Sequence, residues 1–207
     1  MRTLTQDSSV TKNIKKTITL LSLFFVASLL FSVEAQTSKG IRLKTDPPKF
    51  IQKRLALVIG NADYKTAPLR NTVNDARSMN KTLSDLGFSV DLVENATQKE
   101  MKKRIDLFGR KLQSVKGVGL FYFSGHGMQV KGQNYLIPLG ANLDSEEDVE
   151  YESVNAGRIV AKMESARNFM NILILDACRN NPYARSFRSA SQGLATLVAP
   201  VGTFIAY

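Results

Sequence analysis

The chain contains one histidine, His126, and one cysteine, Cys178, and each follows an apolar run. The first run reads Val118-Gly-Leu-Phe-Tyr-Phe-Ser-Gly-His126, and the second reads Asn171-Ile-Leu-Ile-Leu-Asp-Ala-Cys178. Such short runs, ending in small or polar residues, are typical of buried parallel strands, whose carboxyl ends meet at one edge of a sheet. We therefore expect an imidazole and a thiol on neighbouring strands. A thiol becomes a strong nucleophile only when a base removes its proton, so this pair is the smallest set that can carry acyl transfer.

The elements that must position this pair follow from local patterns. Asn71 or Thr72 is expected to cap a helix that runs to about Leu86, and Thr97 with Glu100 forms a capping box for the next helix. The remaining expected elements are strands over 54–60, 88–93, 118–124, 171–178 and 202–207, helices over 97–115 and 153–164, a hairpin turn at 131–132, and loops over 144–150 and 179–201. Strands that alternate with helices predict an α/β domain with a mostly parallel central sheet.

The first 35 residues have the features of an export signal. Three lysines precede an apolar stretch over 18–33, and Val33-Glu-Ala35 places small residues before a cleavage point at Gln36. We expect a signal peptide over 1–35 and an exported, periplasmic or secreted protein; an uncleaved membrane anchor is the alternative. Residues 36–52, which contain Pro47-Pro48, are interpreted as a linker.

Composition limits the classes of partner. The chain of 207 residues is 43% hydrophobic and 22% charged, which fits one globular domain and is too apolar for a disordered protein. The formal net charge is +10, or +8 without residues 1–35, and its basic residues are spread along the chain. With no recognisable nucleic-acid motif, this charge predicts weak attraction for anions rather than nucleic-acid binding. A single cysteine forms no internal disulfide, so the fold depends on its core.

Four motifs together resemble those of the caspase-like peptidases, and specifically the metacaspase-like proteins of bacteria. These motifs are Leu55-Ala-Leu-Val-Ile-Gly-Asn61, Leu69-Arg-Asn-Thr-Val-Asn-Asp-Ala-Arg77, Tyr122-Phe-Ser-Gly-His-Gly127 and Leu175-Asp-Ala-Cys-Arg-Asn-Asn-Pro182. The resemblance covers residues 53–207 and implies a caspase-like catalytic domain, in which helices flank the central sheet. Because family members continue with further strands, it also implies that the carboxyl-terminal strands are missing and that the domain is truncated at this end.

The resemblance also implies roles for individual residues. Cys178 would be the nucleophile, His126 the general acid and base, and the reaction would pass through a thioester. The backbone N–H groups of Gly127 and Cys178 would hold the oxyanion, a contribution typically worth a few kcal/mol. The alternative is a buried structural cysteine with a hydrogen-bonded histidine. Gly125 and Gly127 also fit a tight turn.

Two carboxylates are implied to set the specificity. Asp75 and Asp176 match acidic residues that line the metacaspase pocket for the residue before the scissile bond, and Ser124 matches a serine of the same pocket. A partly buried pair of carboxylates favours arginine or lysine in that pocket. The structural alternative is that Asp75 supports the first helix and that Asp176 only binds loop amides.

Calcium and self-cleavage are further expectations from the family. Many metacaspases are activated by calcium, and the acidic stretch offers suitable oxygen ligands, although a solvated charge run is the simpler interpretation and no metal ligands are assigned. The acidic residues concerned are Asp144, Glu146, Glu147 and Asp148. No cofactor is needed for the chemistry. A basic preference would make the loop that contains Arg179, Arg185 and Arg188 a site of self-cleavage.

Three functional hypotheses remain. The first is an exported cysteine endopeptidase of caspase-like fold that acts on peptide or protein substrates. The second is a non-catalytic interaction module with the same fold, and the third is an unrelated thiol hydrolase. The intact pair of His126 and Cys178 favours the endopeptidase, and the end of the sequence favours the interaction module. An unrelated thiol hydrolase would not need Asp75 together with Asp176.

Overall fold

The computed structural model describes residues 53–178 and 193–207, with Cys178 described by its backbone only. The predicted export signal, the predicted linker and the arginines of the proposed self-cleavage loop lie outside the described residues. Among the residues that are described, no helix has the length and apolar character needed to cross a membrane.

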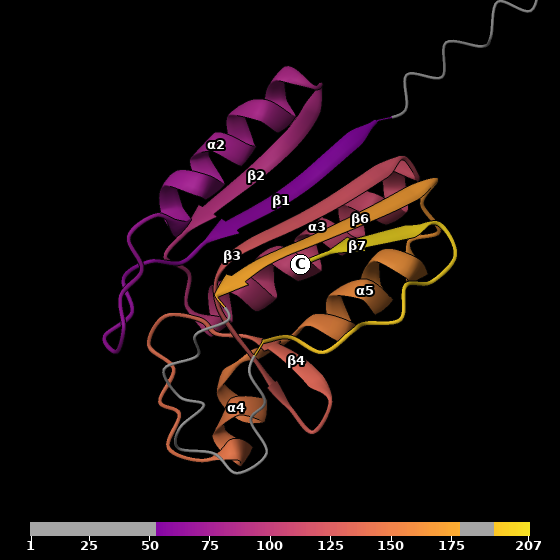
Figure 1. The fold of residues 1–207 in the computed structure, drawn as a ribbon. Helices are drawn as coiled ribbons and strands as arrows, with labels where there is room; N and C mark the ends of the chain where they lie inside the picture. Colours follow the sequence, from indigo (N-terminus) through magenta and orange to yellow (C-terminus); the bar gives the residue numbers. More distant parts are fainter. Residues whose placement is uncertain (1–52, 179–192) are drawn as a thin grey trace, which may run out of the picture. The chain divides into compact units, whose positions relative to one another are not determined.

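A parallel sheet forms the centre of the domain (Figure 1). Its strands are β1 (Arg54–Gly60), β2 (Phe88–Glu94), β3 (Val118–Val130), β6 (Met170–Cys178) and β7 (Thr203–Ala206). They lie in the order β2-β1-β3-β6-β7, and each neighbouring pair is parallel. The prediction of an α/β fold with a mostly parallel central sheet is therefore confirmed.

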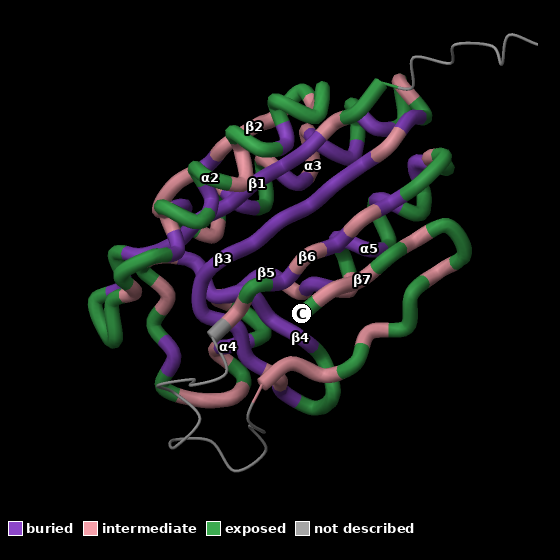
Figure 2. The backbone as a smooth tube through the Cα atoms, turned by 45° about the horizontal axis from the view of Figure 1, so that its top comes forward, coloured by how far each residue is buried: buried purple, intermediate pink, exposed green. Residues whose placement is uncertain are grey.

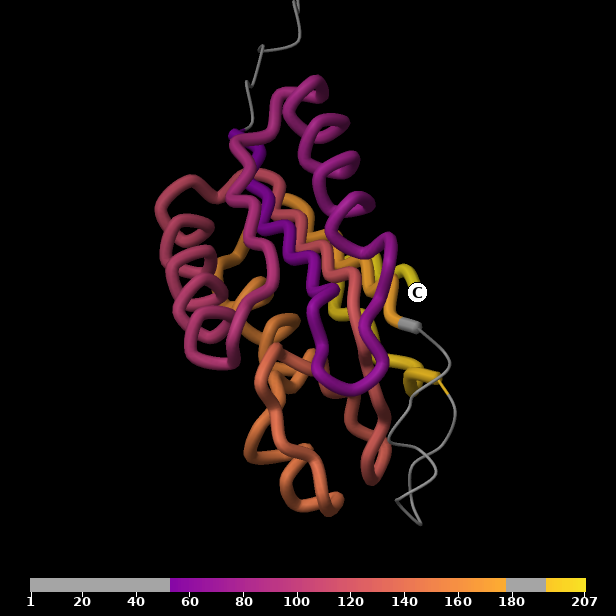
Figure 3. Tube along the Cα trace, turned by 90° about the vertical axis from the view of Figure 1, so that its left-hand side faces the viewer, coloured from indigo at the N-terminus to yellow at the C-terminus, as the bar shows by residue number. Residues whose placement is uncertain are grey.

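Helices cover both faces of this sheet (Figure 3). Helix α2 (Thr72–Asp85) packs on one face, where its Ala76 and Leu83 share a core cluster with Val58 and Tyr122. Helices α3 (Gln98–Val115) and α5 (Ala156–Ser165) pack on the other face in a larger cluster. The alternation of side chains along each strand thus divides the core into two layers.

β3 continues beyond the predicted end of its strand. We expected it to stop at Ser124, but it runs unbroken to Val130 and is buried over most of its length (Figure 2). Beyond His126 it leaves the parallel sheet and pairs with the antiparallel strand β4 (Gln133–Leu136). Lys131 and Gly132 have φ values of 49° and 76°, as a two-residue hairpin turn requires. The predicted hairpin is confirmed.

Two predicted elements have different bounds in the structure. The acidic stretch expected to be a loop contains α4 (Glu146–Glu152), because Ser145 and Asp148 form a reciprocal capping box and acidic side chains are favourable in a first helical turn. The helix expected from residue 153 begins at Ala156 instead. Before it, β5 (Val154–Asn155) pairs with β4, and Asn155 caps the helix by accepting a hydrogen bond from the Arg158 N–H.

Candidate active site

The register of β3 and β6 brings the two predicted catalytic residues together. In this parallel pair, His126 lies opposite Cys178 and Ser124 lies opposite Asp176. Neighbouring strands are separated by about 4.8 Å, so the backbones of these residues are adjacent at the carboxyl end of the sheet. The expectation that both motifs meet at one sheet edge is met, while the catalytic roles stay predictions.

The imidazole of His126 is buried and held by a backbone carbonyl. The residue is 2% exposed, and its Nε2 lies 2.7 Å from the carbonyl oxygen of Ala67. Because a carbonyl only accepts hydrogen bonds, Nε2 must carry the ring proton in the neutral form. Nδ1 then bears a lone pair, and this atom is buried without a hydrogen-bond partner in the described part of the chain. The ring therefore presents an unused basic nitrogen.

The environment of His126 favours the neutral imidazole. Burial lowers its pKa from the ordinary value of 6.5, and the hydrogen bond to the Ala67 carbonyl opposes this shift only in part. Desolvation has this sign because it penalises the charged imidazolium. A neutral imidazole can accept a proton at neutral pH, which is the state that a general base needs.

Tyr64 supports His126 from the loop after β1. Its ring centroid lies 4.5 Å from that of the imidazole, and its hydroxyl accepts a hydrogen bond of 3.1 Å from the His126 backbone N–H. The same hydroxyl donates to the carbonyl of Ile137 at 2.9 Å. Tyr64 therefore fixes the ring face and the backbone of His126 at once.

Gly125 and Gly127 lie within β3, so their interpretation as a tight turn is wrong. A Cβ on Gly125 would lie 2.7 Å from the Tyr64 hydroxyl and 2.7 Å from the Phe123 ring. A Cβ on Gly127 would lie 2.8 Å from the Cβ of Ala177 on the neighbouring strand. These residues are glycines because other groups occupy the space of a side chain.

Asn61 was not predicted as a site residue, yet its backbone N–H donates to the carbonyl of Ser124 at 2.9 Å. It is fully buried at the end of β1, where its side-chain oxygen accepts from the Ala96 N–H at 2.8 Å. Its backbone carbonyl accepts from the Thr72 hydroxyl at 2.6 Å. An asparagine directly after an apolar strand was the available signal for this role.

The three predicted specificity residues meet around Tyr122. The Tyr122 hydroxyl donates to the Asp176 carboxylate at 3.1 Å. Burial is the main cause that raises the pKa of Tyr122 to about 12, with Asp176 and Asp75 adding to the shift and a hydrogen bond with Ser124 opposing it. Tyr122 was not predicted as a site residue, although it lies in the same motif as His126.

The two carboxylates are more accessible than expected. Asp75 and Asp176 are both exposed, which corrects the prediction of a partly buried pair, whereas Ser124 is 1% exposed. Asp75 lies in the first turn of α2, where a negative charge is favourable, so its helix-supporting role is also present. Asp176 binds the Tyr122 hydroxyl. Since the residue is at the end of β6, its carboxylate is free to meet a ligand from solvent.

The acidic stretch does not form a metal cage. In the part of the chain that the structure describes, no three His, Cys, Asp or Glu side chains are placed to hold a metal ion. Asp148 instead accepts hydrogen bonds from the backbone and hydroxyl of Ser145, which lower its pKa. Glu150 pairs with Lys131 at 3.3 Å. Asp148 and Glu150 therefore serve a helix cap and an ion pair in this structure.

Comparison with known proteins decides the family. A family model described as the caspase domain matches residues 53–200. The chain belongs to the caspase-domain family. Human mucosa-associated lymphoid tissue lymphoma translocation protein 1 is 31% identical over 140 residues, which cover 65% of this chain and 16% of that protein. Pig caspase-1 is 30% identical over 138 residues, which cover 63% of this chain and 32% of that protein.

Solved structures of caspase and other proteins are also similar to this caspase domain. The Drosophila initiator caspase Dronc has a TM-score of 0.46 at 16% identity, over 63% of this chain and 52% of that one. Protein GSU0716 of Geobacter sulfurreducens has a TM-score of 0.48 at 18% identity, over 62% of this chain and 52% of that one. The chain spans about a sixth to a third of the curated relatives named above, so their activities are not transferred to it.

Proposed function

We propose that this caspase domain is a cysteine endopeptidase that cleaves peptide bonds after arginine or lysine. The observation that carries the proposal is the state of His126. Its Nε2 proton is fixed on the Ala67 carbonyl, its Nδ1 has no partner in the described residues, and its backbone is opposite that of Cys178. This arrangement supplies a neutral base next to the cysteine.

In the first half of the reaction, Nδ1 of His126 takes the proton of the Cys178 thiol. The thiolate attacks the carbonyl carbon of the scissile bond, and the resulting oxyanion accepts hydrogen bonds from the backbone N–H groups of Gly127 and Cys178. The imidazolium then returns its proton to the leaving amine. The C–N bond breaks, and the acyl group stays on sulfur as a thioester.

In the second half, water takes the place of the amine. His126 removes a proton from the water, the hydroxide attacks the thioester carbon, and the C–S bond breaks. The proton passes back to the Cys178 sulfur, which restores the thiol, and the carboxylic acid product leaves. His126 acts as base and then as acid in both halves: burial favours the neutral form that accepts the proton, and the imidazolium formed in that step is the acid that returns it.

Specificity in this proposal comes from the charges near Tyr122. Asp176 accepts a hydrogen bond from the Tyr122 hydroxyl, and the charge of Asp75 also acts on this hydroxyl, which supports a shared site for one cationic side chain. A guanidinium group can bind a carboxylate with two parallel hydrogen bonds, whereas an ammonium group binds as a compact charge. Arginine is therefore expected to be preferred to lysine.

The first experiment is hydrolysis of short fluorogenic peptides that end in Arg, Lys or Asp, by the full chain and by its Cys178→Ala variant. Cleavage after Arg or Lys that disappears in the variant supports the proposal. Cleavage after Asp would retain the nucleophile and refute the acidic pocket. A folded protein that cleaves none of the peptides would favour the non-catalytic interaction module.

Variants of the carboxylates separate specificity from chemistry. Asp176→Asn is expected to raise KM for the Arg peptide with a smaller change in kcat. Asp85→Asn is the matched control, since Asp85 is an exposed carboxylate in the last turn of α2 that pairs with Lys81. Equal kinetics for both variants would show that Asp176 does not bind the substrate.

Calcium activation and self-processing are further proposals, and both are tested in the same assay. Calcium activation would appear as a higher rate when the ion is added and its loss with a chelator. Self-cleavage would appear as clipping near Arg185 in the wild-type chain and an intact Cys178→Ala variant. Equal clipping of the two proteins would mean that another protease is responsible.

We further propose that the protein is exported and acts on peptide or protein substrates. The proposal rests on the basic and apolar pattern of residues 1–35. Amino-terminal sequencing of the protein isolated from its native cells is expected to begin at Gln36. A start at Met1 with the protein in the membrane fraction would establish an anchored form, and only then would the membrane be a partner.

A further inference from the structure

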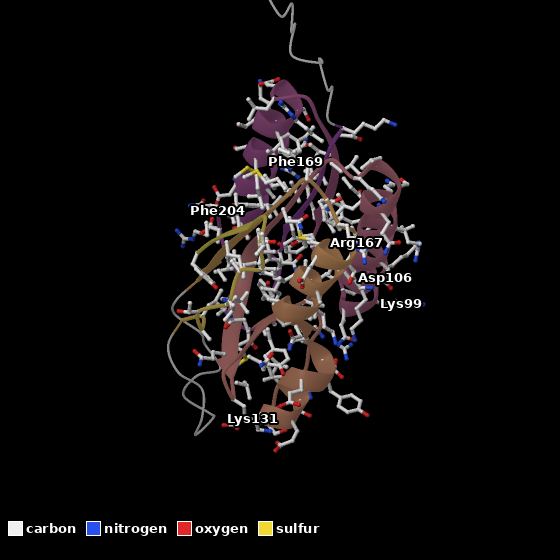
Figure 4. All side chains as sticks on the ribbon, turned by 90° about the vertical axis from the view of Figure 1, so that its right-hand side faces the viewer. Lys99, Asp106, Lys131, Arg167, Phe169 and Phe204 are labelled. Carbon is white, nitrogen blue, oxygen red and sulfur yellow. The ribbon has the colours of Figure 1, made fainter. Side chains whose placement is uncertain are left out.

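A cavity of about 400 Å³ lies on the face of the sheet opposite α2, outside the site described above. Its walls come from α3, β4, α4, β5 and α5. Figure 4 looks onto α5 with α3 beside it, and Asp106 of α3 is labelled there. The cavity is lined by Lys102, Ile105, Asp106, Tyr135, Glu150, Ser153, Val154, Asn155, Arg158, Ile159 and Lys162. Its volume is within the range of small-molecule sites.

The acidic residues that line the cavity are in ion pairs, whereas two of its basic residues form none with the part of the chain that the structure describes. Asp106 pairs with Lys162 at 2.7 Å, and Glu150 pairs with Lys131 at 3.3 Å. Lys102 and Arg158 have no ion pair within the described residues, and both are exposed at the cavity rim. Two cations are therefore available to a ligand, while the acidic groups already have partners.

One residue of the cavity wall, Ser153, has a buried hydroxyl without a hydrogen-bond partner in the described residues. Ser153 is 3% exposed, and its Oγ makes no hydrogen bond within the described part of the chain. A buried polar group that lacks a hydrogen bond is unfavourable. Ser153 is the C-cap of α4 and lies directly before β5; the amino terminus of α5 nearby favours negative charge, whereas the carboxyl terminus of α4 does not.

The remaining lining combines three apolar side chains with Tyr135 and the polar Asn155. Ile105 of α3 and Ile159 of α5 are almost fully buried, and the side chain of Val154 is also buried. These groups can cover the uncharged part of a ligand, whereas the cations and the hydroxyl can bind its anionic part. A simple inorganic ion would leave the apolar wall unused.

We propose that this cavity binds a small organic anion, with its phosphate or carboxylate group held by Lys102, Arg158 and the Ser153 hydroxyl. The hydrocarbon or ring portion of the ligand lies against Ile105 and Ile159. The site is separate from the proposed peptidase site, and it does not depend on the chain being a peptidase.

Binding is tested by calorimetric titration of the full chain with AMP, citrate and adenosine. AMP carries a phosphate and citrate carries carboxylates, whereas adenosine has the ring and sugar of AMP without the charge. We expect saturable binding of AMP or citrate at one site and much weaker binding of adenosine. Equal affinity for AMP and adenosine would overturn the proposal, as would no binding of AMP or citrate up to about 10 mM.

Variants locate the site. Arg158→Ala is expected to weaken binding of the anion by about tenfold, the effect of losing a hydrogen bond between charged groups. Lys99→Ala is the control for loss of a surface cation, because Lys99 is an exposed lysine of α3, the helix that carries Lys102, and does not line the cavity (Figure 4). Equal weakening in both variants would indicate unspecific attraction by the basic surface and refute the site.

Ser153→Ala distinguishes binding from folding. Because the hydroxyl has no partner within the described residues, its removal is expected to leave the thermal midpoint of the ligand-free protein unchanged or higher. The same variant is expected to bind the anion more weakly. A lower midpoint with unchanged anion affinity would show that Ser153 is structural only.

Discussion

The pH dependence of stability is expected to report directly on His126, because this is the only histidine in the chain. His126→Gln removes the titrating ring and keeps a polar side chain. The native imidazole is 2% exposed, and burial lowers its pKa below the ordinary value of 6.5. The unfolded chain exposes the same group to water, so its pKa returns to about 6.5.

The sign of the effect follows from this difference. Between the native pKa and about 6.5, the unfolded state binds more protons than the native state, so the free energy of unfolding rises with pH. Above this window both states are neutral, and no penalty remains. As the pH falls through about 6.5 the stability is lost, and the loss ends below the native pKa. One proton limits the slope to about 1.4 kcal/mol per pH unit.

Urea unfolding of the wild type and of His126→Gln between about pH 5 and pH 8 measures this effect. Carboxylates titrate in both proteins, so the difference between the two profiles isolates the imidazole. The wild type is expected to lose more stability than the variant as the pH falls. Parallel profiles, or a histidine ring that titrates above pH 6.5 by NMR, would refute the argument that burial controls this group.

Four further substitutions test the packing and the polar contacts. Gly125→Ala is expected to cost about 1–3 kcal/mol in urea unfolding, since its Cβ would clash with Tyr64; Gly109→Ala, whose Cβ meets nothing closer than 3.7 Å in α3, is expected to stabilise the protein by up to about 1 kcal/mol. Tyr122→Phe is expected to raise KM for the Arg peptide about threefold to tenfold with little change in kcat, because the Asp176 carboxylate loses the hydrogen bond that holds it in position; an unchanged KM would exclude a positioning role. Ser145→Ala is expected to cost about 1 kcal/mol in urea unfolding through loss of the α4 cap, and a cost near zero would mean that Asp148 holds the helix start alone.

The sequence predicts the sheet well because its strands are strongly apolar and separated by helical patterns. The pairing of His126 with Cys178 follows from two apolar runs that each end in a reactive residue, because the carboxyl ends of neighbouring parallel strands lie at the same edge of the sheet. The capping residue Thr97 also predicts the start of α3, where its hydroxyl accepts from the Glu100 N–H. These features depend on local pattern and on general rules of sheet geometry.

Contacts between segments distant in sequence are the part that local pattern does not contain. The carbonyl of Ala67 binds His126 across 59 positions, and the Tyr122 hydroxyl binds Asp176 across 54. The exposure of Asp176 likewise depends on what covers the end of β6. Helix α4 was not predicted for a different reason. A run of acidic residues suggests a solvated loop, and the capping box of Ser145 and Asp148 was the signal that indicates a helix instead.

Strand β3 carries His126, and the carbonyl of Ala67 binds its imidazole. These two parts of the chain are expected to differ in local stability. β3 pairs with β1 and β6 along one half and with β4 along the other, so its amide hydrogens are expected to exchange with solvent only on global unfolding. Residues 65–68, which include Ala67, are exposed and belong to no helix or strand. The amide hydrogens of residues 65–67 are expected to exchange through small fluctuations, since Pro68 has none. The position of the imidazole is thus protected by the stability of the whole domain, whereas the choice between its two neutral tautomers is controlled by the movement of one short surface segment.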